Sequence, residues 1–441
     1  SQRLFFNTSW WFYGSQENFK KADKSNLLSL EIGVYDPLTG TSNSAIAAAS
    51  RSSHKSQGFG SAPTLGSRTE YIEIIDGKRP SSNDPFEGIN TTWSRLEGGA
   101  PIGIMVAQVI KYFNFKHPEK SIEALVSIHK AIEKLPTSLW KERKLAATKQ
   151  LILDCTGVQI QFNAERPYGV AGESLKINLN VVQQSKLTVE LETIKTTEGV
   201  TQLGQALETN ERFTQSFEVT LDNSISTPYW LLKKGSLGTF AIENKEWIGK
   251  PQTPNPVQIE YHLNIAGTSI AFEAAVQHHK TDPVRGEVIN PFYILPALGV
   301  TFEQPVFLYA NDEAQTLRLN VTSYGEAYEG AIELCHPKGW EIDQATLPIT
   351  LNGRGSSQFL EYQLKPTTAA ESGVLGPLAI QGSKKENVFA VQTLGYTHIP
   401  KQYIAQPSEA RAVRLDLKIP KINVGYIAGA GDTVKERLQT V

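Results

Sequence analysis

The chain has 441 residues, which at about 100–200 residues per domain predicts roughly three domains. Its 40% hydrophobic residues, 34 Gly and 23 Pro exclude a disordered or collagen-like protein and indicate a globular chain with many turns. The formal net charge of -2 provides no global field for nucleic acid or an anionic membrane, so the sequence predicts no nucleic-acid partner.

Three further features of composition set limits. No uncharged apolar run approaches the roughly 18 residues of a spanning helix, so no membrane span is predicted. Cys155 and Cys335 are too far apart for a disulfide framework or a thiolate metal site, and we interpret both as buried structural thiols. Because Met105 is the only methionine, we expect that a segment precedes residue 1.

Residues 1–153 are predicted to be mainly helical. A short strand at residues 4–7 precedes the aromatic run Trp10, Trp11, Phe12 and Tyr13, which needs a large core or a binding wall. The apolar spacing predicts helices over residues 44–49, 101–115, 118–135 and 139–153. We interpret the many lysines of the last three as a solvated face rather than an anion site.

From residue 158 the hydrophobic period changes to two. Apolar residues alternate over 158–162, 175–181, 187–191, 217–221, 257–265 and 270–276, which is typical of half-buried strands. We expect residues 175–181 and 187–191 to form a hairpin through a turn at 183–185, with Leu175, Ile177, Leu179 and Val181 pointing inward together. The pattern predicts one antiparallel β-sandwich over residues 154–285.

Residues 286–400 repeat this organisation and predict a second sandwich, with strands at 306–310, 317–321, 332–335, 359–364 and 388–394. Residues 401–441 are predicted to form a linker strand at 413–417, a strand near 421–427 and a helix at 434–441. These would open a C-terminal α/β unit, so we expect the chain to be cut at both ends. The glycine turn at 429–431 is interpreted as a packing turn rather than a dinucleotide site, because Val434 stands at the position of the third glycine.

Candidate chemistry is sparse. The eight histidines include no H-x-x-H or H-E-x-x-H pair, so no zinc site is predicted in this chain. We expect His262 to face solvent and His278 and His279 to point to opposite faces of a strand. Neither a G-x-S-x-G elbow nor a phosphate-binding G-x-x-x-x-G-K-[ST] loop occurs.

The most suggestive segment is residues 50–60, which brings Arg51, His54, Lys55 and Gln57 together beside Gly58 and Gly60. Two interpretations stay open. The segment is either a loop that binds a polar ligand, or an ordinary helix end whose polar groups satisfy backbone carbonyls.

Residues 3–14, the segment Glu31-Ile32-Gly33-Val34-Tyr35 and His54-Lys55-Ser56-Gln57 resemble the C-terminal half of the LmbE/PIG-L family of zinc-dependent N-deacetylases. The match is closest to large multidomain bacterial members, in which β-sandwiches and a further α/β domain follow. Pro337, Gly339 and Trp340 also resemble the P-x-G-W of sandwich domains that accompany glycosidases.

The resemblance implies a Rossmann-like α/β fold for residues 1–153 and removal of acetyl groups from N-acetylglucosamine-type sugars by a metal-activated water. The family's zinc is held by an A-H-P-D-D-E segment and a downstream H-x-x-H segment. Neither is present in these 441 residues, so no catalytic residue or metal ligand carries over. Zinc is expected only in the intact parent.

The sequence therefore predicts a multidomain α/β plus all-β protein: a partial Rossmann-like domain, two antiparallel β-sandwiches and the start of an α/β unit. The expected function is that of a non-catalytic fragment of an amino-sugar deacetylase; the alternative is a non-enzymatic glycan- or protein-binding sandwich protein. Accessory sandwiches suggest a periplasmic or extracellular location. The predicted substrate-binding residues, for a carbohydrate or amino-sugar ligand, are Arg51, His54, Lys55, Gln57, Trp10 and Trp11.

Overall fold

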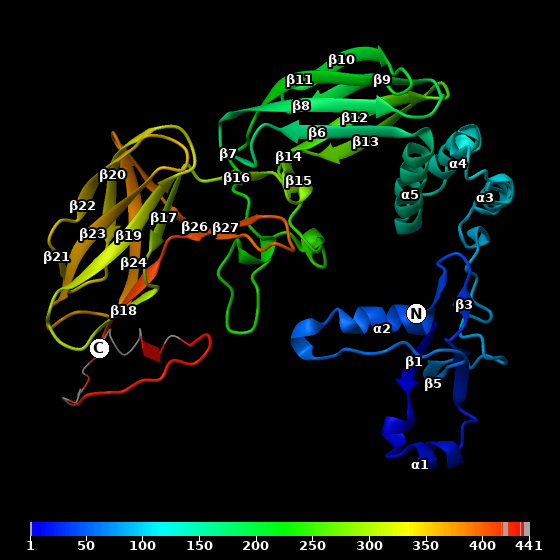
Figure 1. The fold of residues 1–441 in the computed structure, drawn as a ribbon, viewed down its shortest axis with the longest axis horizontal. Coiled ribbons are helices and arrows are strands. Elements are labelled where there is room, and N and C mark those ends of the chain that lie inside the picture. Colours follow the sequence, from blue (N-terminus) through cyan, green and yellow to red (C-terminus); the bar gives the residue numbers. More distant parts are fainter. Residues whose placement is uncertain (1, 416, 418–421, 433, 436–441) are drawn as a thin grey trace. The chain divides into compact units, whose positions relative to one another are not determined.

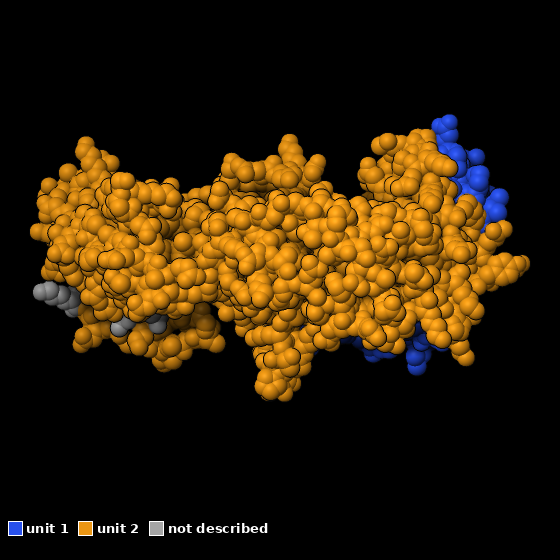
Figure 2. All heavy atoms as spheres, turned by 90° about the horizontal axis from the view of Figure 1, so that it is seen from above, with its two compact units in different colours: residues 1–104 blue, residues 105–441 orange. Residues whose placement is uncertain are grey.

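A computed structural model describes residues 2–415, 417, 422–432 and 434–435 (Figure 1). The chain divides into two compact units, one ending at Ile104 and the other beginning at Met105 (Figure 2). The sequence predicted a first domain of residues 1–153, which is longer than the first compact unit.

The first unit contains a three-stranded sheet in the order β1-β5-β2, formed by β1 (Arg3–Thr8), β5 (Thr69–Gly77) and β2 (Leu27–Glu31). Both pairings are antiparallel, so the predicted Rossmann-like layer, which needs parallel strands, is not confirmed. Leu27 and Leu28, which point to opposite faces of β2, are both buried. The remaining short elements are η1 (Trp10–Tyr13), α1 (Gln16–Lys21), β3 (Tyr35–Asp36), β4 (Thr41–Ser42), α2 (Asn43–Ser52), η2 (Lys55–Gln57) and η3 (Trp93–Arg95).

One loop of the first unit is organised by a single carboxylate. Glu87 accepts hydrogen bonds from the backbone N–H groups of Ser81 and Ser82, at 3.0 and 2.8 Å, and from both serine hydroxyls at 2.6 Å. These donors favour the ionised form and lower the pKa of Glu87 to about 2.

The predicted helices form α3 (Ala100–Tyr112), α4 (Ile122–Glu133), which follows the turn η4 (Pro118–Ser121), and α5 (Leu139–Thr156). The Ser138 hydroxyl caps α5 by accepting from the N–H of Lys141 at 3.2 Å, and Gly157 ends it in a left-handed conformation. Ile122 of α4 and Ile152 of α5 are buried in one core with strands of the first sandwich. The apolar faces of these helices therefore belong with the sandwich rather than with the N-terminal sheet.

The first sandwich consists of two sheets, ordered β10-β9-β12-β13 and β11-β8-β6-β14-β15. Leu175, Ile177, Leu179 and Val181 of β8 are at most 1% exposed, so their shared inward direction is confirmed. The strands are β6 (Val158–Ala164), β8 (Ser174–Gln183), β9 (Val189–Thr196), β10 (Gly199–Ala206), β11 (Arg212–Thr220), β12 (Gln258–Ile265), β13 (Thr268–Ala275), β14 (Gln277–Asp282) and β15 (Gly286–Pro291).

The predicted hairpin between residues 175–181 and 187–191 is wrong, because β8 and β9 lie in different sheets. The chain crosses between the sheets at Gln183, which is fully buried. Its side-chain amide donates to the carbonyl oxygens of Thr156 and Leu187, at 3.0 and 3.1 Å. These hydrogen bonds hold the chain at Gln183, where a hairpin would have its turn.

The second sandwich also has its own core and two sheets, ordered β21-β23-β19-β17-β26-β27 and β18-β28-β24-β20-β22, with β25 beside β24. Most pairings are antiparallel, but β18 runs parallel to β28 and β17 runs parallel to β26. The strands are β17 (Leu298–Phe302), β18 (Val306–Tyr309), β19 (Gln315–Ser323), β20 (Tyr328–Cys335), β21 (Trp340–Ile342), β22 (Thr346–Leu351), β23 (Ser357–Pro366), β24 (Gly373–Gln381), β25 (Lys384–Asn387), β26 (Phe389–Leu394), β27 (Gln402–Pro407) and β28 (Ala410–Arg414).

The Pro337-x-Gly339-Trp340 segment has a structural explanation. Trp340 is buried against Tyr309, with ring centroids 4.7 Å apart, and its indole N–H donates to the carbonyl of Glu371 at 2.8 Å. Gly339 has a φ of 81°, and a Cβ there would lie 2.3 Å from the carbonyl oxygen of Ala369. Only glycine fits at that position.

The C-terminal segment differs from its prediction. Residues 402–414 belong to the second sandwich as β27 and β28, and β28 ends at Arg414 rather than at residue 417. Residues 422–429 form no strand, because no neighbouring strand among the described residues pairs with them. Apart from Val434 and Lys435, the helix predicted at 434–441 lies outside the described residues.

A group of tyrosines joins the two sandwiches within the second unit. It lies beside a short parallel pair of strands, β7 (Tyr168–Val170) and β16 (Tyr293–Leu295), and Ile294 of β16 belongs to the core of the first sandwich. The Tyr168 ring contacts those of Tyr324 and Tyr403, at 5.7 and 5.4 Å between centroids, and Tyr403 also contacts Tyr293 at 5.3 Å. Burial raises the pKa of Tyr324 and of Tyr403 to about 12, so both phenols stay neutral at physiological pH.

The cysteines are not equivalent. Cys155 is buried as predicted, but Cys335 is exposed, which corrects that prediction. The reason is the strand period: Leu334 points into the core, so its neighbour Cys335 at the end of β20 points outward. Among the described residues, none of the helices combines the length and apolar character needed to cross a bilayer.

Candidate functional site

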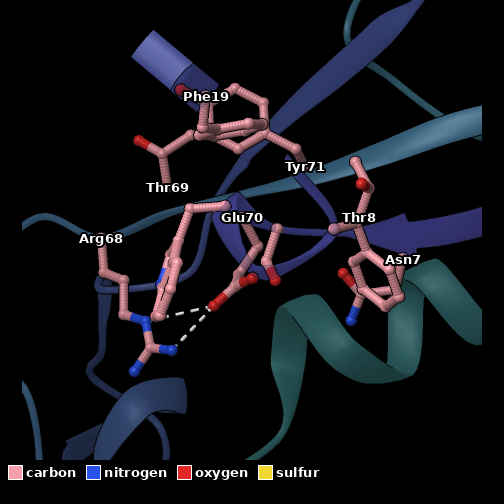
Figure 3. A pocket seen from close by; sticks show the side chains of 10 residues that line it. Asn7, Thr8, Phe19, Arg68, Thr69, Glu70 and Tyr71 are labelled. Atoms are coloured by element: carbon pink, nitrogen blue, oxygen red, sulfur yellow. Dashed lines mark hydrogen bonds and ion pairs between the residues drawn. The ribbon is translucent and has the colours of Figure 1, made fainter. Parts of the chain in front are cut away.

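A cavity of about 490 Å³ lies within the first unit, where β1 runs into η1 (Figure 3). Its walls combine aromatic rings with charged and polar side chains. The lining residues are Asn7, Thr8, Ser9, Trp10, Phe12, Phe19, Arg68, Thr69, Glu70 and Tyr71.

The sheet register brings the two sides of the cavity together. Thr8 at the end of β1 is opposite Tyr71 of β5, which places the start of β5 beside the start of η1. Gly14 ends η1 with a φ of 81°, a conformation that glycine adopts without strain. The chain then turns into α1, whose Phe19 ring contacts the Tyr71 ring at 5.1 Å between centroids.

Aromatic packing holds the wall in place. Phe12 contacts Phe6 of β1 at 4.9 Å, and Tyr13 contacts Phe19 at the same separation. Trp10 is nevertheless 41% exposed and Phe12 60%, so their rings present apolar surface to solvent. Exposed aromatic surface of this kind, beside a cavity, marks a site of interaction.

An ion pair forms the polar side of the cavity. The Nε and Nη2 of Arg68 donate to one carboxylate oxygen of Glu70, at 3.2 and 2.8 Å, as the dashed lines in Figure 3 mark. The side chains are 45% and 28% exposed, so solvent screens the pair and its contribution to stability is modest. The Nη1 of Arg68 also donates to the Thr64 hydroxyl at 3.4 Å.

This arrangement is suited to binding a small polar ligand with apolar faces. Flat aromatic faces accept apolar C–H surface, while the guanidinium, carboxylate and the Asn7 amide exchange hydrogen bonds. Zinc, which the family resemblance implies, finds no ligand set here. No three His, Cys, Asp or Glu side chains in the described part of the chain lie close enough together to hold a metal ion.

Of the two predicted tryptophans, Trp10 lines the cavity. Trp11 does not, although its ring is 5.7 Å from that of Trp10, and it is 72% exposed.

The four polar residues predicted from the 50–60 segment are not among the lining residues. Arg51 of α2 lies over the Phe59 ring at 5.1 Å, and the Nδ1 of His54 lies 3.0 Å from the carbonyl oxygen of Ser50. Lys55 and Gln57 form η2, which ends at the left-handed Gly58. These contacts are those of a helix end that satisfies its own backbone, and a role for the four residues at the rim of a larger cleft stays a prediction.

Phe19 and the β5 residues that line the cavity were not among the predicted site residues. The signal for β5 was present, because Thr69, Tyr71, Ile72, Ile74 and Ile75 are residues that favour strands. The register that joins β5 to β1 depends on residues some 60 positions apart, which local patterns do not encode.

Comparison with known proteins adds little. No protein-family model and no curated protein matches the chain. Among solved structures, the D0-D1 domain of intimin aligns at 10% identity and a TM-score of 0.18, covering 57% of this chain and 97% of that one. Trypsin-activated alpha-2-macroglobulin from Escherichia coli aligns at 10% identity and 0.20, covering 58% and 18%. A protein of unknown function from Porphyromonas gingivalis W83 aligns at 10% and 0.14, covering 58% and 99%. Superpositions this poor support no argument about function.

Proposed function

We propose that this chain is a carbohydrate-binding β-sandwich protein and that its ligand site is the cavity beside η1. The observation that supports the proposal is the lining itself, in which Trp10, Phe12 and Tyr71 share one cavity with the Arg68–Glu70 pair. A sugar ring has apolar C–H faces and a rim of hydroxyl groups, so it needs both kinds of surface at once.

The charged pair favours an N-acetylated sugar within this class. An acetamido group presents one N–H donor and one carbonyl acceptor, which match the Glu70 carboxylate and the Arg68 guanidinium respectively. At about 490 Å³ the cavity falls in the usual range of small-ligand sites, about 300–1,000 Å³. The two sandwiches have separate cores and serve in this proposal as rigid carriers, in a protein of the periplasm or cell exterior.

The test is titration of the chain with N,N′-diacetylchitobiose, followed by calorimetry and tryptophan fluorescence. We expect saturable binding with a dissociation constant below about 1 mM. Trp10→Ala removes one stacking face, and we expect affinity to fall about tenfold. Arg68→Gln removes a positive charge at a partly exposed position, so the fold should not change. It should weaken binding of the acetylated sugar more than binding of glucosamine.

Trp11→Ala is the matched control, because Trp11 is the adjacent aromatic residue but does not line the cavity. It should leave affinity within about twofold of the parent chain. The proposal fails if no saturable binding occurs, or if Trp10→Ala and Trp11→Ala have equal effects while circular dichroism shows both variants folded.

A second candidate function, amino-sugar N-deacetylation by a longer protein, is favoured by the resemblance of residues 3–14, 31–35 and 54–57 to the LmbE/PIG-L family. The reading frame upstream of the Ser1 codon discriminates between the two. An A-H-P-D-D-E segment there, with chelator-sensitive release of acetate from N-acetylglucosamine by the longer gene product, would establish the enzyme. Sugar binding without that segment would establish the binding protein.

A further inference from the structure

A short crossover joins β22 to β23, which lie in opposite sheets of the second sandwich. It consists of residues 352–356, and we call it the 352–356 turn. Asn352 and Gly353 begin the turn, and Asn352 is the only asparagine of the chain that precedes a glycine. Glycine places no side chain beside its own backbone nitrogen, so that nitrogen is open to approach by the asparagine carboxamide.

Hydrogen bonds hold the rest of the turn in place. The N–H of Gly355 donates to the carbonyl of Ser323 at 2.7 Å, and the N–H of Ser356 donates to the carbonyl of Gly353 at 3.0 Å. By contrast, neither the Asn352 carboxamide nor the Gly353 N–H has a hydrogen-bond partner among the described residues. Asn352 is exposed, and Gly353 has a φ of 125°, which residues with a side chain rarely adopt.

These two unpartnered groups can react with each other. The deprotonated backbone nitrogen of Gly353 attacks Cγ of Asn352, the Cγ–Nδ2 bond breaks, and the amide nitrogen takes up the proton and leaves as ammonia. The product is a cyclic succinimide. Water then opens the ring at either of its two carbonyl groups, which gives aspartate or isoaspartate at position 352. Water is the only co-reactant.

The next residue, Arg354, connects the two sandwiches. Its Nη2 is paired with the Glu173 carboxylate of the first sandwich at 2.8 Å, and its Nη1 donates to the carbonyl of Tyr324. Isoaspartate continues the main chain through its side-chain carbonyl, so the backbone before Arg354 becomes longer by one methylene carbon. The reaction also adds a carboxylate two residues from Arg354, which competes with Glu173 for the guanidinium.

We propose that Asn352 is a site of spontaneous deamidation and that its conversion weakens the junction between the two sandwiches as the protein ages. The reactive pair and the residue that fastens the junction are consecutive in one turn, so a change at Asn352 acts directly on Arg354. This inference is independent of the sugar site in the first unit.

The conversion is measured by incubating the full chain in mildly alkaline buffer, followed by peptide mass mapping and enzymatic methylation of isoaspartate. We expect Asn352 to convert at least about tenfold faster than Asn43 or Asn223, because these precede serine, whose Cβ hinders ring closure. Mildly acidic buffer should slow the conversion, since the Gly353 nitrogen is then less often deprotonated. Equal rates at the three asparagines would overturn the proposal.

The effect on the junction is measured on the converted chain by small-angle scattering and urea unfolding. We expect a wider range of sandwich orientations and a lower unfolding midpoint than in the fresh chain. Asn352→Gln is the matched control, because a glutamine must close a larger and less favourable ring. This variant should keep the scattering profile of the fresh chain throughout the incubation. A converted chain with the profile and midpoint of the fresh chain would contradict the proposed weakening.

Discussion

Arg354 of the second sandwich forms an ion pair with Glu173 of the first. Its Nη2 donates to both carboxylate oxygens, at 2.8 and 2.9 Å. Glu173 also accepts from the Nη2 of Arg166 at 3.1 Å and from the backbone N–H of Val170 at 3.0 Å. The Arg354 guanidinium lies over the Tyr168 ring, 5.4 Å from its centroid. One carboxylate thus accepts hydrogen bonds from three groups at the junction of the two sandwiches.

Breaking this contact should loosen the junction. The Arg354 and Glu173 side chains are 24% and 18% exposed, so Arg354→Met leaves a partly buried carboxylate with fewer donors and should cost about 1.5–3 kcal/mol. A double-mutant cycle with Glu173→Gln, followed by urea unfolding, measures the coupling, and small-angle scattering should report a wider range of sandwich orientations. Arg318→Met is the control, because the Arg318–Glu361 pair is 53% exposed on both sides and should contribute less than about 1 kcal/mol. Equal effects at the two pairs would contradict the prediction.

His129 should make the helical layer sensitive to acid. Its side chain is only 5% exposed on α4, and desolvation lowers its pKa, with the carboxylate of Glu133 acting in the opposite direction. The unfolded chain therefore binds a proton more readily, so stability is complete above the unfolded pKa of about 6.5 and falls as the pH drops below it.

Melting of α4 and α5 at pH about 7.5 and about 5.5, followed by circular dichroism, measures this dependence. His129→Leu should abolish most of the difference, whereas His117→Gln, at an exposed histidine, should retain it. A pH dependence that survives His129→Leu would show that other groups cause it.

Glu87 should titrate far below an ordinary glutamate. The serine donors lower its pKa from 4.5 to about 2, so the loop gains stability above the unfolded value and loses it as the pH falls through about 2. Carbon NMR of the side-chain carboxyl measures the midpoint. Ser81→Ala with Ser82→Ala should move that midpoint upward, toward 4.5, because two donor hydroxyls are removed. An unchanged midpoint would mean that the hydroxyls do not hold the carboxylate.

The core of the first sandwich gives a simple stability test. Ile177 is fully buried, so Ile177→Ala should lower the free energy of unfolding by about 2–5 kcal/mol. Val200→Ala, at a residue 56% exposed on β10, should change it by no more than about 0.5 kcal/mol. Chemical denaturation of both variants provides the comparison, and similar losses would argue against the assigned inward face of β8.

The strands were predictable where a residue's environment repeats along its own strand. The alternation of Leu175, Ile177 and Leu179 with polar residues predicts which face of the strand is buried. These three residues are buried in the structure. Pairing between strands is a different matter, because it depends on partners elsewhere in the chain. Gln183 was predicted to lie in a hairpin turn. Instead, the chain crosses from one sheet to the other at this residue, and its buried amide donates hydrogen bonds there.

The site was predictable only in part for the same reason. The aromatic run identified Trp10, but the Arg68–Glu70 pair reaches the cavity through the register of β5 against β1. The prediction of a polar site rested on four polar residues close together in sequence, Arg51, His54, Lys55 and Gln57. A cluster of polar residues in the sequence does not distinguish a binding loop from a helix end. Cys335 shows a similar limit, since a single position decides whether a strand residue points inward or outward.

The position of β28 has a consequence for biosynthesis. Residues 410–414 fill the gap between β18 and β24, so one sheet of the second sandwich stays incomplete until β28 has left the ribosome. The first sandwich completes its sheets at Pro291 and is free to fold earlier. At about 5–20 residues per second, the nascent second sandwich waits several seconds with an open edge. The first sandwich therefore folds before the second. Until β28 emerges, the unpaired edges of β18 and β24 are the part of the chain that most needs protection by chaperones.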